Sequence, residues 1–173
     1  MKIIFDNDAA TDDAIALIYL MSQNADIAAI TIAGTGEAHG EDGARNMANL
    51  CQMLGRPSMP IAYGDGNSCE SKGKPFPNFL RDLMDNIFSD MNVPQNPSPV
   101  INGSAVELIK QTLESCDEKV TILATGPLTN IAQFIQQYPE LKNTVDKIVI
   151  MGGAVHVPGN ITGLIPESDN HVA

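Results

Sequence analysis

Short apolar runs alternate along the chain with longer segments that carry apolar residues at helical spacing. The first run begins at Ile3 and is typical of a buried strand in a parallel sheet. The segment that follows, Ala14 to Leu20, is apolar on nearly every side, which predicts a buried helix. Further strands are expected at 26–34 and 60–63, with a helix over 42–54 between them, starting at Asp42 and ending before Gly55. This βαβαβ order predicts a parallel sheet with right-handed crossovers.

The regular pattern is interrupted over 64–99 and then resumes. The interruption contains one short amphipathic piece at 79–88 and is expected to form an excursion over the sheet edge. Ser104 and Glu107 have the spacing of a capping box, which predicts a helix from there to about Ser115. The last elements are expected to be a strand at 120–124, a helix at 128–137 and a strand at 147–151.

These elements together predict the fold class α/β, with an open, mainly parallel sheet flanked by helices and a Rossmann-like core. The chain has 173 residues, which is enough for one domain with a sizeable core. We therefore expect a single domain over 1–173, with the irregular excursion inside it.

Four carboxylates lie between the first strand and the first helix: Asp6, Asp8, Asp12 and Asp13. A strand-to-helix turn places them at the carboxyl end of the strand, where open α/β sheets bind ligands. Two like charges in contact cost on the order of a few kcal/mol at an effective dielectric constant of about 20. A divalent cation removes this cost, and hard oxygen ligands suit calcium or magnesium. Helix capping by Thr11, with the two later acids favoured by the helix dipole, is the alternative, but it leaves Asp6 and Asp8 unexplained.

The composition limits the classes of binding partner and the cellular compartment that we expect for the protein. The net charge of −11 offers no basic patch, so DNA or RNA is not an expected partner. No apolar run is long enough to span a bilayer, and the N-terminus leads directly into a strand, which leaves no room for a signal peptide. The three cysteines, Cys51, Cys69 and Cys116, form no C-x-x-C pair, so a disulfide framework or zinc site is not indicated and a reduced cytoplasm is expected.

The acidic stretch resembles the signature of the inosine–uridine-preferring nucleoside hydrolases, D-x-D-P-G-x-D-D-A-x-A. All four aspartates match it, and so do Ala14 and Ala16. Ala9 and Ala10 stand where the family has Pro and Gly. Because Pro fixes φ and Gly admits φ > 0, this departure leaves the geometry of the turn open.

Two later segments resemble the same family. Residues 125–132 have its T-G-x-L-T-N-I-A pattern, and Met151 to Asn160 has its M-G-G…G-N pattern. The resemblance implies that the main-chain carbonyl of Thr125 is a calcium ligand and that Asn160 contacts the ribose. An ordinary strand-to-helix turn punctuated by Gly126 and Pro127 is the plainer interpretation of the first segment. His39, in the loop after the second strand, is expected to be an exposed loop residue rather than a functional imidazole.

The resemblance implies an enzyme of nucleoside salvage: calcium-dependent hydrolysis of the N-glycosidic bond of purine or pyrimidine ribonucleosides to ribose and free base. Asp8 is the candidate general base and a metal ligand. Asp13 and the Thr125 carbonyl are the other candidate ligands, and Asp12 is expected to bind the ribose hydroxyls. Asp6 is expected to orient the loop from behind. No residue is assignable to protonation of the leaving base.

The family is longer than this chain and continues with an A-E-F-N element that binds the sugar. Residues 161–173 contain Glu167, Asp169, Asn170 and His171, but not in that order. The chain is therefore expected to be a truncated N-terminal portion, completed by a homo-oligomer or by a complementing chain. A shortened paralogue with its own use for Glu167 and His171 is the alternative.

Two other classes of function stay open. One is a haloacid-dehalogenase-type phosphatase, because Asp6 and Asp8 follow a strand; its D-x-D-x-T pattern needs Thr where this chain has Ala10. The other is a non-catalytic or partner-completed half-domain. An unpaired sheet edge and exposed apolar surface would mark that class.

Overall fold

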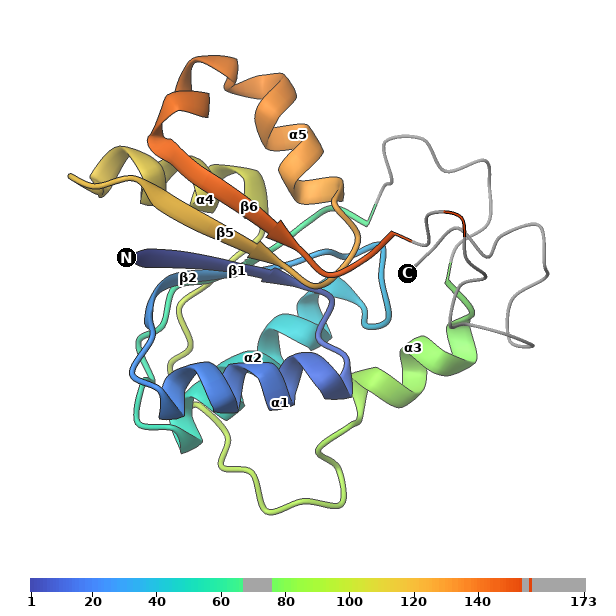
Figure 1. Cartoon of the computed structure of the whole chain (residues 1–173). Coiled ribbons are helices and arrows are strands. Elements are labelled where there is room, and N and C mark those ends of the chain that lie inside the picture. Colours follow the sequence, from blue (N-terminus) through green and yellow to red (C-terminus); the bar gives the residue numbers. More distant parts are fainter. Residues whose placement is uncertain (67–75, 154–155, 157–173) are drawn as a thin grey trace.

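Within residues 1–66, 76–153 and 156, which the computed structural model describes, six strands form one parallel sheet (Figure 1). The strand order is β4-β3-β2-β1-β5-β6, and every neighbouring pair is parallel. The strands are β1 (Lys2–Asn7), β2 (Asp26–Ile32), β3 (Ile61–Tyr63), β4 (Ile101–Asn102), β5 (Val120–Ala124) and β6 (Val145–Ile150). The predicted α/β fold class is confirmed.

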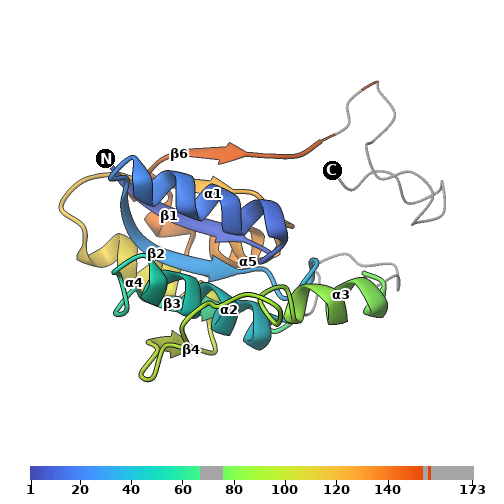
Figure 2. The ribbon, with the colours of Figure 1, turned by 90° about the horizontal axis from the view of Figure 1, so that it is seen from below.

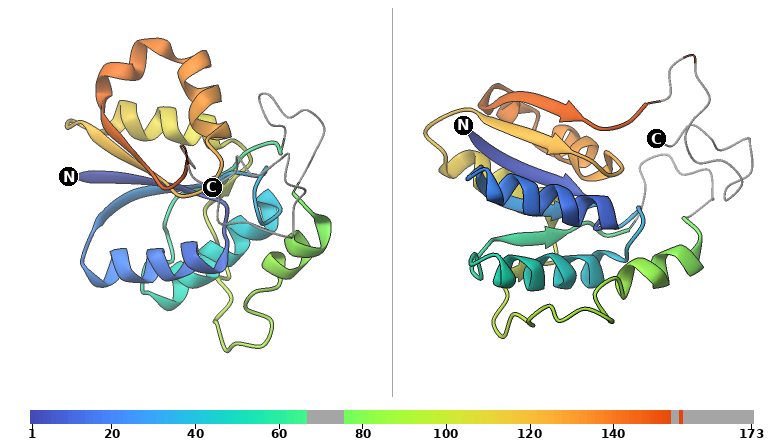
Figure 3. Two further views of the ribbon diagram at one scale, coloured as in Figure 1. Left: turned by 45° about the vertical axis from the view of Figure 1, so that its right-hand side comes forward. Right: turned by 60° about the horizontal axis from the view of Figure 1, so that its bottom comes forward.

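Helices cover both faces of the sheet, with α1 and α2 on one face and α4 and α5 on the other (Figures 1 and 3). Among the described helices, none combines the length and the apolar character that a membrane crossing requires. The helices are α1 (Thr11–Ser22), α2 (Gly40–Met53), α3 (Asn78–Asp85), α4 (Ala105–Ser115) and α5 (Thr129–Gln137), followed by the 3-10 helix η1 (Pro139–Thr144).

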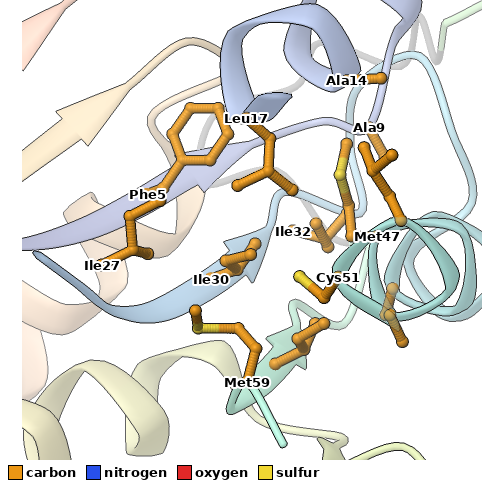
Figure 4. Close-up of a cluster of buried hydrophobic side chains, with 14 of the residues drawn as sticks. Phe5, Ala9, Ala14, Leu17, Ile27, Ile30, Ile32, Met47, Cys51 and Met59 are labelled. Carbon is orange, nitrogen blue, oxygen red and sulfur yellow. The ribbon is translucent and has the colours of Figure 1, made fainter. Parts of the chain in front are cut away.

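The core has two parts, one on each side of the sheet. Alternation along β1 sends Phe5 to one side and Ile4 to the other. On the first side, Phe5 packs with Leu17 of α1 and Met47 of α2 (Figure 4). On the second side, the buried residues of β1 and β5 pack against α4 and α5, including Ile109 and Phe134. The central strands are thus buried on both faces, which is why they read as continuous apolar runs.

Element ends follow the sequence signals in most places. Ser104 Oγ accepts a hydrogen bond from Glu107 N at 3.3 Å, as a capping box requires. Gly55 follows α2 with φ of +76°, the conformation expected after a helix C-terminus. The prediction of Asp42 as the cap of α2 was wrong, because the helix begins at Gly40 and His39 occupies the N-cap. Strand β4 was not predicted, because two residues are too few to show an alternation.

The turn from β1 to α1 differs from the helix start expected from sequence. Thr11 is the first residue of α1, and the N-cap is Ala10, so the interpretation of Thr11 as the cap was wrong. Asp13 takes over part of the capping, because its Oδ2 accepts a hydrogen bond from Ala10 N at 3.0 Å. The positive φ of the turn, +60°, falls on Ala9. Proline cannot adopt that angle, so the turn differs from one with Pro at this position.

Helix α1 is buried on one side only, which corrects the prediction of a fully buried helix. Ala14 and Leu17 face the core, whereas Ile15, Ile18 and Tyr19 are 63%, 39% and 64% exposed. Their spacing places these three residues, the α1 apolar stripe, on one face of the helix. Strand β6 also ends in exposed apolar residues, and Figure 2 shows it at the edge of the sheet. An apolar face of this kind is typical of a surface that another polypeptide covers.

The two sides of α1 predict two different mutational costs. Leu17→Ala should lower the free energy of unfolding by about 3 kcal/mol, because it opens a cavity in the core. Ile15→Ala should change it by no more than about 0.5 kcal/mol, because the side chain is exposed and Ala is a good helix former. Urea denaturation of both variants measures the difference. Equal losses would contradict the assignment of the two faces.

Introducing the proline of the family signature at position 9, in the β1–α1 turn, should destabilise the protein. Ala9→Pro forces φ to about −65° and removes the N–H that donates to Asn7 Oδ1 at 3.0 Å. We expect a loss of about 3 kcal/mol or more in the free energy of unfolding. Ala9→Gly is the matched control and should fold normally, since Gly adopts positive φ without a Cβ penalty. Wild-type stability in Ala9→Pro would mean that the turn can adopt another geometry.

Candidate active site

The aspartate-rich turn lies where the direction of strand order reverses. The chain runs outward from β1 through β2, β3 and β4, and then returns to place β5 on the other side of β1. In open α/β sheets, the carboxyl ends of the strands at such a switch point form the ligand-binding crevice. Asp8 follows β1 there and Thr125 follows β5, with Thr125 N donating to Asp6 O at 2.9 Å. The topology therefore brings together two regions more than a hundred residues apart.

The carboxylate of Asp13 connects three segments at this point. Its Oδ2 accepts hydrogen bonds from Asp8 N at 3.3 Å and Ala10 N at 3.0 Å. Its Oδ1 accepts a hydrogen bond from Thr125 Oγ1 at 2.5 Å. Asp13 is buried, although it belongs to the first turn of α1. The structure thus brings Asp8, Asp13 and Thr125 together, the three residues that the sequence proposed as metal ligands.

Asp8 is enclosed by main chain from two loops. Its Oδ2 accepts a hydrogen bond from Glu37 N at 3.0 Å, and its carbonyl accepts one from Ala38 N at 3.1 Å. A Cβ at Gly36 would lie 2.2 Å from Asp8 Oδ2, and one at Gly126 would lie 2.8 Å from Asp8 N. Glycine is therefore needed at both positions for the loops to approach this closely.

The site concentrates negative charge in a poorly solvated place. Burial raises the pKa of Asp8, and the adjacent carboxylate of Asp13 raises it further. The pKa of Glu37 is also raised, first by burial and then by the charges of Asp12 and Asp13. None of the ion pairs found within the described residues involves Asp8 or Asp13. A divalent cation with hard oxygen ligands fits this donor set.

Asp6 lies behind the site and is fully buried. Its Oδ1 accepts hydrogen bonds from Thr31 Oγ1 at 2.5 Å and from Asn130 Nδ2 at 2.9 Å. Burial raises the pKa of Asp6 to about 7, although these hydrogen bonds act in the opposite direction. Asp6 thus links β1 to β2 and to α5. Sequence reasoning did not find the roles of Thr31 and Asn130, because each contact joins residues distant along the chain.

The remaining candidates are less well placed or lie elsewhere. Asp12 is exposed on the first turn of α1. Asn160 and the acids and histidine of 161–173 lie outside the described residues. Glu37 was not selected from sequence, although an acid in the loop after the strand beside β1 could have signalled it.

His39 belongs to a second group of metal-capable side chains. Its Nδ1 lies 2.6 Å from Asp85 Oδ2, and its side chain is 43% exposed. The donor atoms of His39, Asp82 and Asp85 lie within 4.8 Å of one another, so this group could also hold a metal ion. Within the described residues, the aspartate turn forms no such group of three side chains, so Asp8 and Asp13 would need carbonyl or water ligands beside them.

Comparison with known proteins places this geometry in one family. Residues 3–168 match the family described as inosine-uridine preferring nucleoside hydrolase. The pyrimidine-specific ribonucleoside hydrolase RihA of Salmonella enteritidis is 38% identical over 170 residues, which cover 94% of this chain and 51% of that protein. The structure of a purine-preferring ribonucleoside hydrolase from Gardnerella vaginalis matches with a TM-score of 0.76 and 29% identity, over 92% of this chain and 51% of that one.

A more distant structure supports the fold alone. The inosine-uridine preferring nucleoside hydrolase of Bacillus anthracis has a TM-score of 0.72 at 23% identity, with 99% of this chain and 56% of that chain covered. The chain thus spans about half the length of the relatives it matches. The family match also favours a hydrolase of this kind over the haloacid-dehalogenase-type phosphatase. Since the match extends over nearly all of the sequence, this chain belongs to the inosine-uridine preferring nucleoside hydrolase family.

Proposed function

We propose that the chain carries the metal-binding part of a calcium-dependent ribonucleoside hydrolase, which releases a free base from ribose. The observation that carries this proposal is the buried pair Asp8 and Asp13 at the switch point, joined to Thr125 by a hydrogen bond. The names of the Salmonella and Gardnerella relatives support a ribonucleoside substrate. We extend the proposal to a single domain over 1–173, acting in nucleoside salvage in the cytoplasm.

Asp8, Asp13 and the main-chain carbonyl of Thr125 would hold the ion. Bound calcium supplies a water of lowered pKa and a point of attachment for ribose hydroxyls. Asp8 would serve as the general base, and the Glu37 N–H holds its carboxylate in orientation. Asp12, exposed beside the pair, accepts a hydrogen bond from a ribose hydroxyl, and Asn160 is proposed as a second sugar contact.

The same carboxylates suit the charge that develops on the sugar. Cleavage of an N-glycosidic bond passes through a transition state with positive charge on the ring, as in glycoside hydrolysis. Fixed negative groups in a poorly solvated site stabilise such charge more strongly than they would in water. Asp6 keeps the strand end in place through Thr31 and Asn130. Uridine and inosine are the proposed test substrates, with no nucleic acid involved.

Calcium should stabilise the purified chain, and the effect should depend on Asp8 and Asp13. At a calcium concentration of 100 times Kd, binding adds about 2.7 kcal/mol to the free energy of unfolding. Asp8→Asn should abolish this stabilisation by calcium. It should also make the metal-free protein more stable, because it removes the cost of burying an acid beside Asp13. Thermal unfolding in calcium and in chelator measures both effects. Asp42→Asn, at an exposed acid that pairs with Arg45, is the matched control.

Hydrolysis of uridine and inosine is measured on the same proteins. We expect the wild type to release the nucleobase in a calcium-dependent reaction. A decrease of about a hundredfold or more in Asp8→Asn would support Asp8 as the general base. If calcium still stabilises both Asp8→Asn and Asp13→Asn against unfolding, the proposed metal site is wrong.

The exposed apolar surface favours a second candidate, a half-domain completed by another polypeptide. The α1 apolar stripe and the end of β6 are the two parts of the surface that such a polypeptide would cover. A partner-completed chain would bind calcium weakly alone, because its metal shell would be incomplete.

Association should therefore depend on the α1 apolar stripe. In purified protein the available partner is a second copy, so light scattering should show concentration-dependent self-association. Tyr19→Glu should shift the chain toward the monomer, because it places a charge in the apolar contact. Gln111→Glu, at an exposed polar position of α4 on the opposite face of the sheet, should leave the association unchanged. A wild-type chain that stays monomeric at all concentrations would count against this candidate.

A further inference from the structure

We propose that α3 braces the loop that orients Asp8, and that Arg81 is the positioning residue through which it acts. The inference deepens the proposed function, on which the importance of Asp8 rests. It assigns a role to α3, the helix within the irregular excursion between β3 and β4, for which the sequence analysis predicted a position but no role. The contacts that carry it join α3, the loop at 34–39 after β2, and the start of α2.

The loop at 34–39 controls the surroundings of Asp8. Two of its main-chain N–H groups, those of Glu37 and Ala38, donate to the carboxylate and the carbonyl of Asp8. Gly36 lies so close to the carboxylate that no side chain fits between them. The loop contains turns and bends but no helix or strand. Contacts outside the loop must therefore help to keep its N–H groups aimed at Asp8.

Arg81 holds both ends of this loop with one guanidinium nitrogen. Its Nη2 donates to the carbonyl of Gly34 at 2.7 Å and to that of Ala38 at 2.9 Å. Hydrogen bonds from a charged donor are shorter and stronger than those between neutral groups. Arg81 Nε is buried and has no hydrogen-bond partner among the described residues. The position of the guanidinium thus satisfies the two loop carbonyls but leaves its own Nε–H without an acceptor among these residues.

Asp85, one helical turn after Arg81, fixes the end of α3 to the start of α2. Its carboxylate accepts hydrogen bonds from His39 N at 2.8 Å and contacts His39 Nδ1 at 2.6 Å. Asn46 Nδ2 of α2 donates to the carbonyls of Met84 at 3.2 Å and Asp85 at 3.0 Å. Residues four apart lie on the same helix face, so Arg81 and Asp85 contact consecutive parts of the chain from 34 to 39.

Apolar packing attaches only the C-terminal end of this segment, where Met84, Ile87 and Phe88 lie partly buried against the core. Earlier in α3, Phe79 and Leu83 are 62% and 59% exposed. The position of the helix around Arg81 therefore depends on polar contacts. Loss of the Arg81 contacts should release the loop at both ends and misalign the Glu37 N–H, while the core under the sheet stays intact.

Amide hydrogen exchange in chelator tests the brace without calcium. In Arg81→Lys, the amides of Glu37 and Ala38 should exchange about tenfold faster than in the wild type, because an ammonium cannot reproduce the placement of a planar guanidinium. Asp85→Asn should give a smaller increase at the same amides. Arg45→Lys is the matched control, since Arg45 pairs on the surface with Glu41 and Asp42 and contacts no part of the loop in the structure.

Calcium binding then connects the brace to Asp8. Arg81→Lys should weaken calcium affinity about tenfold, measured by calorimetry, whereas Arg45→Lys should not change it. If the wild type binds no calcium, the proposed metal site fails, but the exchange data still decide the role of Arg81. Wild-type protection of the Glu37 and Ala38 amides in Arg81→Lys would overturn the brace. Equal acceleration at core amides of α2, such as Leu50, would overturn it too, because Arg81 would then serve overall stability.

Discussion

The carboxylate of Asp13 is the interaction on which the architecture of the site depends. One side chain accepts hydrogen bonds from the turn after β1, from the start of α1 and from Thr125 at the end of β5. Two strands on either side of a topological switch point are thereby joined at their carboxyl ends. The same bonds bring a buried negative charge beside Asp8, and this like-charge contact raises the pKa of Asp8 beyond the effect of burial. A cation would relieve the repulsion that the hydrogen bonds create.

Close approach of main chain to Asp8 is the second requirement of the site. Gly36 and Gly126 allow two loops to contact one residue from opposite sides. Ala9 adopts a positive φ in the turn between Asp8 and α1, and its N–H is held by Asn7 Oδ1. The turn therefore accommodates the departure from the family's Pro-Gly through a conformation that costs an alanine about 1–2 kcal/mol. The carboxylates keep their places because Asp13, rather than the residue at the N-cap, holds the helix start.

Stability and function are distributed unequally over the molecule. The two core clusters bury the central strands on both faces, whereas the α1 apolar stripe and the end of β6 remain exposed. The ends of β1 and β5 thus position Asp8 and Thr125. The loop at 34–39 donates hydrogen bonds to Asp8, and α3 holds that loop through polar contacts. A polypeptide bound to this apolar surface would cover the exposed side of α1.

The sequence by itself determined the class of fold and the location of the acids. Apolar runs identified five of the six described strands, the Ser104 capping box located α4, and the spacing of Asp8, Asp12 and Asp13 placed them at one strand end. These features are local, so periodicity and turn chemistry reveal them. Only the tertiary structure decided which face of α1 is buried, because an all-apolar helix carries no directional signal. It also decided the contacts of Asp6 with Asn130 and of Arg81 with the loop, because these join residues 124 and about 45 positions apart, which no local pattern encodes.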